Sequence, residues 1–161
     1  MGRGLEESCG SVGSVSETLS GAHTRWNIRY HLVWIVKYRK DLLLWSGVSE
    51  CFSEVVRGIG ERYGWVIDTM ATDGNHVHVL MGAPLRYSPA EVVGVMKSLT
   101  AREIFRRFPQ VKGELWGGEF WGDGYYVRTV GNEVTVAVIR EYIKKQGQET
   151  QHKSYEQLKL F

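Results

Sequence analysis

The stretch TDGNHVHVLMG, residues 72–82, decides the predicted fold, because it contains a tight turn followed by a strand of strongly alternating character. Asp73-Gly74 is a dipeptide that favours a hairpin turn, and the preceding WVIDTMA (65–71) is typical of a partner strand. Successive side chains in a strand point to opposite faces. The faces of the second strand therefore consist of His76, His78 and Leu80 on one side and Val77, Val79 and Met81 on the other. We interpret the second face as core and the histidine face as a candidate site.

Sequence patterns on both sides of this hairpin predict a βαββαβ unit. Alternating apolar residues predict a strand before it, and apolar residues at helical spacing predict helices between the strands. Ser88, Pro89 and Glu91 have the spacing of a helix start with a capping box. The predicted elements are a strand at 26–36, a helix from Ser49 to Gly64, strands at 65–71 and 76–82, a helix from Ser88, a strand at 125–130, and a last helix capped by Asn132 and ended by Gly147.

This order predicts an α+β fold of the ferredoxin-like, or RRM-like, type. Such a fold has an antiparallel sheet with two helices on one face, so the extra C-terminal helix that carries Tyr142 can use the other face. A length of 161 residues suits one domain, which we place at 25–148. Residues 1–24 are rich in Gly and Ser and are predicted to be a flexible extension, and 149–161 a C-terminal tail.

Composition excludes several classes of protein. Cys9 and Cys51 are the only cysteines, which gives no disulfide framework and no Cys-x-x-Cys metal site. No apolar run approaches the roughly 20 residues that span a bilayer, and the N-terminus has no signal-peptide pattern, so we expect a cytoplasmic protein. The formal net charge is +2, so a polyanion would have to be held by local clusters of Lys and Arg.

The pair His76 and His78 is the first candidate for chemistry. Neutral imidazole is a common metal ligand, and two imidazoles on one face of a strand can present nitrogen atoms to one cation. A solvated strand face would give the same pattern, so the pair alone leaves both interpretations open. The metallo-β-lactamase pattern, which continues with Asp-His, is disfavoured because Val79-Leu80-Met81 follow here. An amidohydrolase barrel, which needs about 250 residues, and a phosphodiesterase with two His-x-Ser/Thr motifs are also disfavoured.

The last predicted helix supplies possible partners for the imidazoles. Val134, Val138, Tyr142 and Gln146 recur every four residues, which places a phenol and a carboxamide one turn apart on one helix face. If this helix packs on the open side of the sheet, both groups can approach the histidine pair. The alternative is that Tyr142 is a core aromatic and Gln146 a surface residue.

The combination of these motifs resembles the single-tyrosine HUH transposases of the insertion sequence 200/605 type. The resemblance covers about residues 26–148 and also includes YHLVWIVKYRK, LWGGEFW, YYVRTVG and VIREYIKKQ, in the order of that family. It implies that His76, His78 and Gln146 bind a divalent metal, Mg²⁺ or Mn²⁺, and that Tyr142 is the nucleophile. Gly74-Asn75 departs from the family pattern, in which Pro-Asp often precedes the histidines.

The resemblance also implies a reaction and partners. The enzyme would cleave and rejoin single-stranded DNA at insertion-sequence ends through a 5′-phosphotyrosine intermediate, recognise DNA hairpins, and act as a homodimer.

Tyr125 and Tyr126 are rival nucleophiles, but their rings point to opposite faces of a strand and neither has a Gln one turn later. The candidate phosphate contacts are Arg29, Lys37, Arg39, Lys97, Arg102 and Arg106.

Four aromatic residues are candidates for stacking on bases. Base stacking by Trp116, Trp121, Tyr125 and Tyr126 is possible in principle, although core or loop packing is the interpretation we favour for most of them.

One alternative function is a related tyrosine nuclease for repeat-element maintenance or replication initiation. Another is a non-catalytic RNA-binding module, which would be expected to have exposed aromatics in place of His76 and His78.

Overall fold

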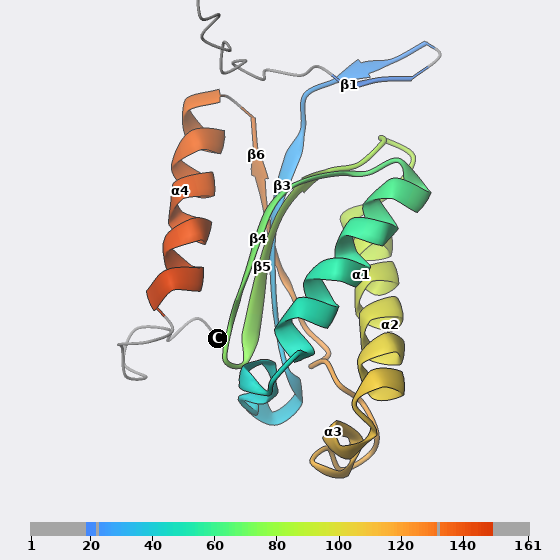
Figure 1. Cartoon of the computed structure of the whole chain (residues 1–161). Helices are drawn as coiled ribbons and strands as arrows, with labels where there is room; N and C mark the ends of the chain where they lie inside the picture. The colour runs from blue at the N-terminus through green and yellow to red at the C-terminus, as the bar shows by residue number, and fades with distance from the viewer. Residues whose placement is uncertain (1–18, 22, 132, 150–161) are drawn as a thin grey trace, which may run out of the picture.

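The structure, a computed structural model, describes residues 19–21, 23–131 and 133–149 (Figure 1). The strands are β1 (Leu19–Ser20), β2 (Arg25–Trp26), β3 (Arg29–Ile35), β4 (Val66–Asp73), β5 (His76–Gly82) and β6 (Tyr126–Val130). The α-helices are α1 (Val48–Tyr63), α2 (Pro89–Arg107), α3 (Pro109–Gly113) and α4 (Glu133–Glu149), and two short 3-10 helices are η1 (Lys37–Arg39) and η2 (Leu42–Leu44). The predicted cap Asn132, most of the N-terminal extension and nearly all of the C-terminal tail lie outside the described residues.

Four strands form one antiparallel sheet in the order β4-β5-β3-β6. Each strand–helix–strand crossover therefore connects two parallel strands that have a third strand between them, as in a ferredoxin-like βαββαβ unit. Helices α1 and α2 cover one face of this sheet, and α4 lies on the opposite face (Figure 1). The predicted α+β fold with an additional C-terminal helix is confirmed.

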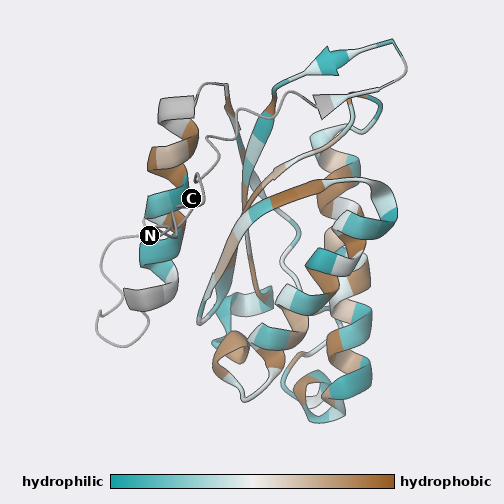
Figure 2. Cartoon of the chain, turned by 45° about the horizontal axis from the view of Figure 1, so that its top comes forward, coloured by the Kyte–Doolittle hydropathy of each residue, from teal (hydrophilic) through white to brown (hydrophobic). Residues whose placement is uncertain are grey.

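The main core lies between the sheet and the layer of α1 and α2. Trp34, Phe52 and Trp121 meet edge to face within it, with ring centroids between 5.7 and 6.0 Å apart. Apolar residues follow the strands between the two helical layers in Figure 2. Val77, Val79 and Met81 belong to this core, as the alternation in β5 predicts. Burial of these side chains fixes the register of the strand, because a shift by one residue would exchange its two faces.

A second, smaller apolar cluster holds α4 against the other face. It consists of Leu80 of β5, Val130 of β6, and Ile139 and Ile143 of α4. The guanidinium of Arg140 adds two hydrogen bonds of 2.7 Å to the carboxylate of Asp68 on β4. This attachment places α4 over the face that carries the histidines.

The helix ends that the sequence predicts are mostly present. Ser88 and Glu91 form the reciprocal capping box at the start of α2, and Gly64 follows α1 in the left-handed conformation at φ 67°. The hairpin loop, however, consists of Gly74 and Asn75, because Asp73 still pairs with His76 across the two strands.

The predicted end of the last helix is wrong. Gly147 does not end the last helix, since α4 continues to Glu149. A Cβ atom at this position would lie 3.4 Å from the Cβ of Ala71, an ordinary contact distance, so this turn of α4 lies directly against β4. Within the predicted extension, Leu19–Ser20 pair with Arg25–Trp26 as a small antiparallel ribbon.

The packing of the main core generates a stability prediction. Phe52 is fully buried, so we expect Phe52→Ala to lower the free energy of unfolding by about 3–5 kcal/mol through lost contacts and the resulting cavity. Leu44→Ala, at an exposed leucine of η2, is the matched control and should change it by less than about 0.5 kcal/mol. Urea unfolding followed by circular dichroism measures both values, and equal losses would contradict the assignment of the core.

Candidate active site

The two histidines of β5 lie on the face of the sheet against which α4 packs, and both are buried. His76 is 8% exposed and His78 3% exposed, and their ring centroids are 5.1 Å apart. Polar groups at this depth require partners or a ligand, because desolvation without compensation is costly. The interpretation of the pair as residues on a solvated strand face is therefore wrong.

A third histidine, His31 of β3, completes the buried group. Its Nε2 atom lies 3.1 Å from Nδ1 of His78, and the two rings are stacked with centroids 5.4 Å apart. His31 was not among the residues predicted for the site. The signal available in the sequence was alternation, because Leu32 belongs to the core and its neighbour His31 must point to the opposite face of the strand. The strand that pairs with it could not be read from the sequence.

Asn75 of the hairpin loop supports the other histidine. Its side-chain oxygen lies 3.1 Å from Nδ1 of His76, and its Nδ2 donates a hydrogen bond of 3.1 Å to the carboxylate of Asp41. Asp41 follows η1, so a distant segment fixes the amide that meets His76. The departure from Pro-Asp at Gly74-Asn75 thus leaves a polar support for the histidine.

The remaining ring nitrogens of the pair are unsatisfied. Nε2 of His76 and Nε2 of His78 are buried and make no hydrogen bond within the described part of the chain. A carboxylate oxygen of Asp73 lies 3.8 Å from Nε2 of His76. Two imidazoles with Nδ1 engaged and Nε2 unpaired are typical of histidines that bind a cation.

Acidic, histidine and cysteine side chains of the described residues do not by themselves form a metal-binding group. Among residues 19–21, 23–131 and 133–149, no group of three or more His, Cys, Asp or Glu side chains could hold a metal ion. A metal bound by His76 and His78 would therefore need a neutral oxygen such as the carboxamide of Gln146, or oxygens of water and substrate.

The surroundings keep all three imidazoles neutral. Burial lowers the pKa of His78 from 6.5 to about 3, with smaller contributions from His76 and His31. Burial also lowers the pKa of His76, although Asp73 opposes this, and burial together with the charge of Arg128 lowers the pKa of His31. The neutral form is the one that offers a lone pair to a metal.

Tyr142 of α4 reaches this group in its own chain. Its ring centroid is 5.8 Å from that of His78, with an interplanar angle of 84°, and 6.3 Å from that of His31. The side chain is 41% exposed, so one side of the phenol meets the histidines while the other is open to a substrate. The convergence of the helix tyrosine on the strand histidines is thus present.

Gln146 lies one turn beyond Tyr142 and is half-buried. This turn of α4 lies against β4, since Gly147 adjoins Ala71, which is the strand partner of His78. The buried row of the helix is formed by Ile139 and Ile143, whereas Val138 is exposed. Tyr142 and Gln146 therefore flank the apolar contact instead of forming its centre.

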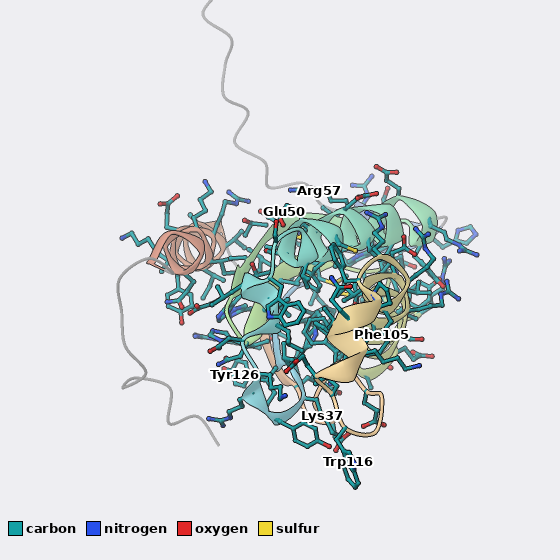
Figure 3. All side chains as sticks on the ribbon, turned by 60° about the horizontal axis from the view of Figure 1, so that its bottom comes forward. Lys37, Glu50, Arg57, Phe105, Trp116 and Tyr126 are labelled. Atoms are coloured by element: carbon teal, nitrogen blue, oxygen red, sulfur yellow. The ribbon has the colours of Figure 1, made fainter. Side chains whose placement is uncertain are left out.

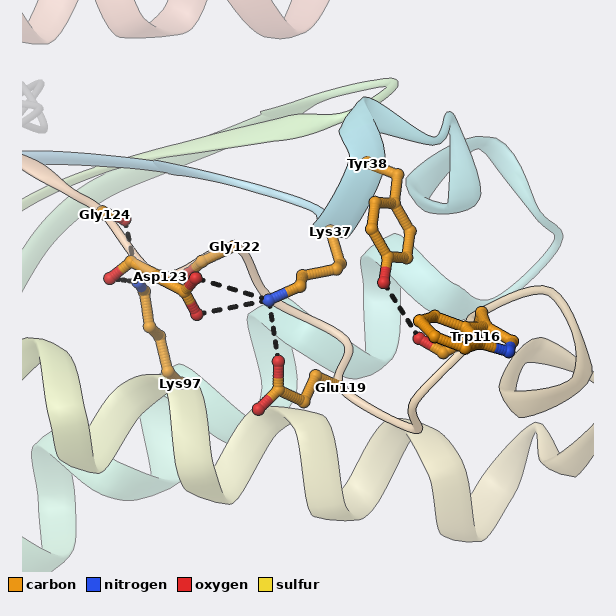
Figure 4. A network of polar contacts seen from close by, with 8 residues as sticks. All are labelled: Lys37, Tyr38, Lys97, Trp116, Glu119, Gly122, Asp123 and Gly124. Atoms are coloured by element: carbon orange, nitrogen blue, oxygen red, sulfur yellow. Dashed lines mark hydrogen bonds and ion pairs between the residues drawn. The ribbon is translucent and has the colours of Figure 1, made fainter.

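The predicted phosphate contacts do not form one surface, and the two lysines among them are engaged in contacts within the protein. Lys37 makes ion pairs of 2.7 Å with Glu119 and 3.2 Å with Asp123, and Nζ of Lys97 donates to the carbonyl oxygens of Gly122, Asp123 and Gly124 (Figure 4). Both lysines thus anchor the loop before β6.

The four arginines among these candidates differ in accessibility. Arg29 is only 5% exposed, whereas Arg39 lies on the surface at η1. Arg102 and Arg106 are exposed on α2, in the helical layer across the sheet from the histidines. A DNA strand over the histidine face would therefore not contact these two without passing around the molecule.

The four aromatic candidates also separate. Trp121 is buried and donates from Nε1 to Oγ1 of Thr100 at 2.9 Å, which confirms core packing for this residue. Trp116 is 87% exposed and lies at the outer edge of the molecule in Figure 3. Tyr126 pairs with Val33, the strand partner of His78, and so lies on the histidine face. Tyr125 lies on the other side, where Nζ of Lys97 is 5.9 Å from its ring centroid.

The fold and the site together define a class of small α+β proteins in which a tyrosine of a C-terminal helix approaches a histidine pair on the sheet face opposite the other helices. Comparison with known families shows to which family of this class the chain belongs. The family model described as "Transposase IS200 like" matches residues 24–146, and the chain belongs to this family.

Individual relatives agree with this assignment. The chain is 36% identical over 121 residues to the ISDra2 transposase TnpA of Deinococcus radiodurans, which covers 75% of this chain and 85% of that protein. It is 32% identical over 128 residues to the transposase for insertion sequence element IS200 of Salmonella typhimurium, covering 80% and 82% of the two chains.

Solved structures share the fold. A transposase crystal structure from Deinococcus radiodurans has a TM-score of 0.64 and 32% identity, covering 80% of this chain and 97% of that chain. A REP-associated tyrosine transposase bound to a REP hairpin has a TM-score of 0.51 and 13% identity, covering 77% and 67%, so this likeness concerns the fold alone. Within the described ranges, the helices of this chain are too short or too polar to cross a membrane.

The buried imidazoles predict a pH-dependent stability. Their folded-state pKa values lie below 6.5, so the unfolded chain binds more protons as the pH falls below that value. Without metal, the free energy of unfolding should be highest above pH 6.5 and should decrease toward the folded pKa of His78 at about 3. Each unit of pKa difference corresponds to about 1.4 kcal/mol, so a loss of a few kcal/mol is expected.

Urea unfolding between pH of about 5.5 and 6.5 limits the contribution of carboxylates, and the comparison with variants separates the histidines from it. His78→Asn should flatten the pH dependence in this range, whereas His23→Asn, at an exposed histidine, should leave it unchanged. An equal slope in the wild type and His78→Asn would contradict a neutral, buried His78.

Proposed function

We propose that this IS200-like transposase cleaves and rejoins single-stranded DNA at insertion-sequence ends, through a metal-dependent reaction with a 5′-phosphotyrosine intermediate. The observation that supports this most is the position of Tyr142, 5.8 Å between ring centroids from His78, beside two unpaired Nε2 atoms. A nucleophile and a cation site are thereby available on one face of the sheet.

The metal of this proposal is Mg²⁺ or Mn²⁺. His76 and His78 would hold it through Nε2, and Gln146 of the same helix as Tyr142 would add its carboxamide oxygen. When bound, the ion supplies a Lewis acid and an orienting template for the scissile phosphate. The fit rests on the neutral imidazoles, whose Nδ1 atoms are already engaged by His31 and Asn75.

Tyr142 provides the nucleophile in this mechanism. Its phenol oxygen loses its proton and forms a bond to phosphorus, while the bond from phosphorus to the 3′ oxygen breaks and that oxygen takes up a proton. The phosphodiester energy is kept in the link to tyrosine, so attack by a 3′-hydroxyl can reseal a strand without ATP. The half-exposed phenol leaves room for the substrate on the side away from His78.

The substrate is an unpaired strand, because a DNA backbone must bend to bring one phosphate to the exposed side of the Tyr142 phenol. Arg128 is exposed and pairs opposite His31, so it is placed to contact a neighbouring phosphate. Tyr126 lies on the same face and can stack on a base. Arg39 and Trp116, both exposed, are further contacts for the hairpin DNA that we expect the protein to bind.

The active form that we propose is a homodimer. β6 is an edge strand, which within the described residues pairs only with β3 and exposes most of its side chains. Open edge strands are templates for pairing with another chain, and a second copy would protect this edge symmetrically. Tyr142 already faces the histidines of its own chain, so catalysis in this arrangement needs no exchange of helices.

The RNA-binding alternative is disfavoured by the same site. Modules of that kind present aromatic rings on an open sheet for base stacking. Here β5 carries imidazoles in the corresponding place, and α4 covers them. A related tyrosine nuclease would use the same chemistry and differ in the DNA that it recognises.

The nucleophile can be tested by trapping the covalent product. The protein with Mg²⁺ or Mn²⁺ should form an adduct with single-stranded DNA that survives denaturing electrophoresis, and Tyr142→Phe should abolish it, because the attacking oxygen is removed. Tyr125→Phe and Tyr126→Phe keep their rings and should retain the adduct. Cleavage by Tyr142→Phe at the wild-type rate would refute the assignment.

The metal ligands can be tested without DNA. Titration with Mn²⁺, followed by the electron paramagnetic resonance signal of the free ion, should show a large loss of affinity in His76→Ala and His78→Ala. Substitution of His23, which is exposed and outside the site, serves as the control. Unchanged affinity in both site variants would rule out the proposed metal centre.

A further inference from the structure

His31 has no role in the chemistry proposed above, yet it is buried against one of the proposed ligands. Nε2 of His31 and Nδ1 of His78 are 3.1 Å apart, and the rings are stacked with an interplanar angle of 21°. Both side chains are buried, so water does not compete for this hydrogen bond.

The direction of the hydrogen bond decides what His78 can bind. A neutral imidazole has one N–H donor and one acceptor nitrogen. If His78 donates from Nδ1, its Nε2 carries a lone pair. If it accepts at Nδ1, its Nε2 carries the proton, and a buried N–H is left without a partner, since no described group bonds to Nε2 of His78. Only the first arrangement suits a cation.

We propose that His31 is the positioning residue of the metal site: its Nε2 accepts a hydrogen bond from Nδ1–H of His78, which fixes the tautomer and orientation of that ligand. This inference rests on the proposed function. His31 acts through His78 and not on the cation, because its Nε2 is already turned toward Nδ1 of His78. Partners of this kind commonly orient metal-binding imidazoles.

The support of His76 makes the assignment consistent. Asn75, fixed by Asp41, meets Nδ1 of His76, just as His31 meets Nδ1 of His78. The supports come from different segments, β3 in one case and the hairpin loop in the other. Both leave Nε2 as the unpaired nitrogen.

The first test is the tautomer of His78 in the metal-free protein at neutral pH, measured by long-range proton–nitrogen correlation spectra of the imidazoles. His78→Asn assigns the signals. The wild type should show His78 protonated at Nδ1. His31→Gln, which retains an acceptor oxygen, should keep this tautomer, whereas His31→Phe, which retains only the ring, should shift it toward Nε2–H. A wild-type His78 protonated at Nε2 would overturn the proposal whether or not the variants fold.

The second test is Mn²⁺ affinity in the same variants. His31→Phe should bind Mn²⁺ about 10–100-fold more weakly than the wild type, and His31→Gln should restore most of the affinity. Wild-type affinity in a cooperatively folded His31→Phe would overturn the proposal. Equal affinity in the wild type and His76→Ala would instead refute the proposed metal centre, and with it a role of His31 toward a metal, even where the tautomer is as expected.

Discussion

Burial of imidazoles beneath α4 constrains every other feature of this face of the sheet. The covering helix is attached through a small apolar cluster and through the pair of Arg140 and Asp68. Polar rings under such a cover must be satisfied from within the protein. His31 and Asn75 satisfy one nitrogen of each ring, and the nitrogens that remain unpaired are the ones that can bind a ligand.

The two faces of the sheet differ in function, because one packs into the main core and the other carries the candidate site. The face toward α1 and α2 contains the large aromatic core, which fixes the register of β3 and β5. Because register sets the face of every residue in a strand, packing on this side determines that His31, His76 and His78 all point to the other side. The main core thus positions the site without contacting its chemistry.

Much of this arrangement follows from local sequence. Alternation in residues 76–82 separates the faces of β5, and Ser88 with Glu91 marks the start of α2, because both patterns depend only on neighbouring residues. His31 was not found, because its contact with His78 depends on pairing between segments far apart in the chain. The same holds for the contact of Asp41 with Asn75. Lys37 and Lys97 are basic residues of the kind that bind phosphates. In the structure, however, Lys37 forms an ion pair and Lys97 donates to a backbone carbonyl oxygen, and both contacts hold the loop before β6.

The proposed metal centre requires that Nε2 of His76 and Nε2 of His78 share one cation beside Tyr142. Anomalous diffraction from crystals soaked in Mn²⁺ tests it most directly, because the signal locates the ion independently of activity. A single strong peak bound by these two nitrogens is expected, with Nδ1 of His78 still directed to His31. An ion bound elsewhere, or rings turned so that Nδ1 meets it, would refute the proposed metal centre.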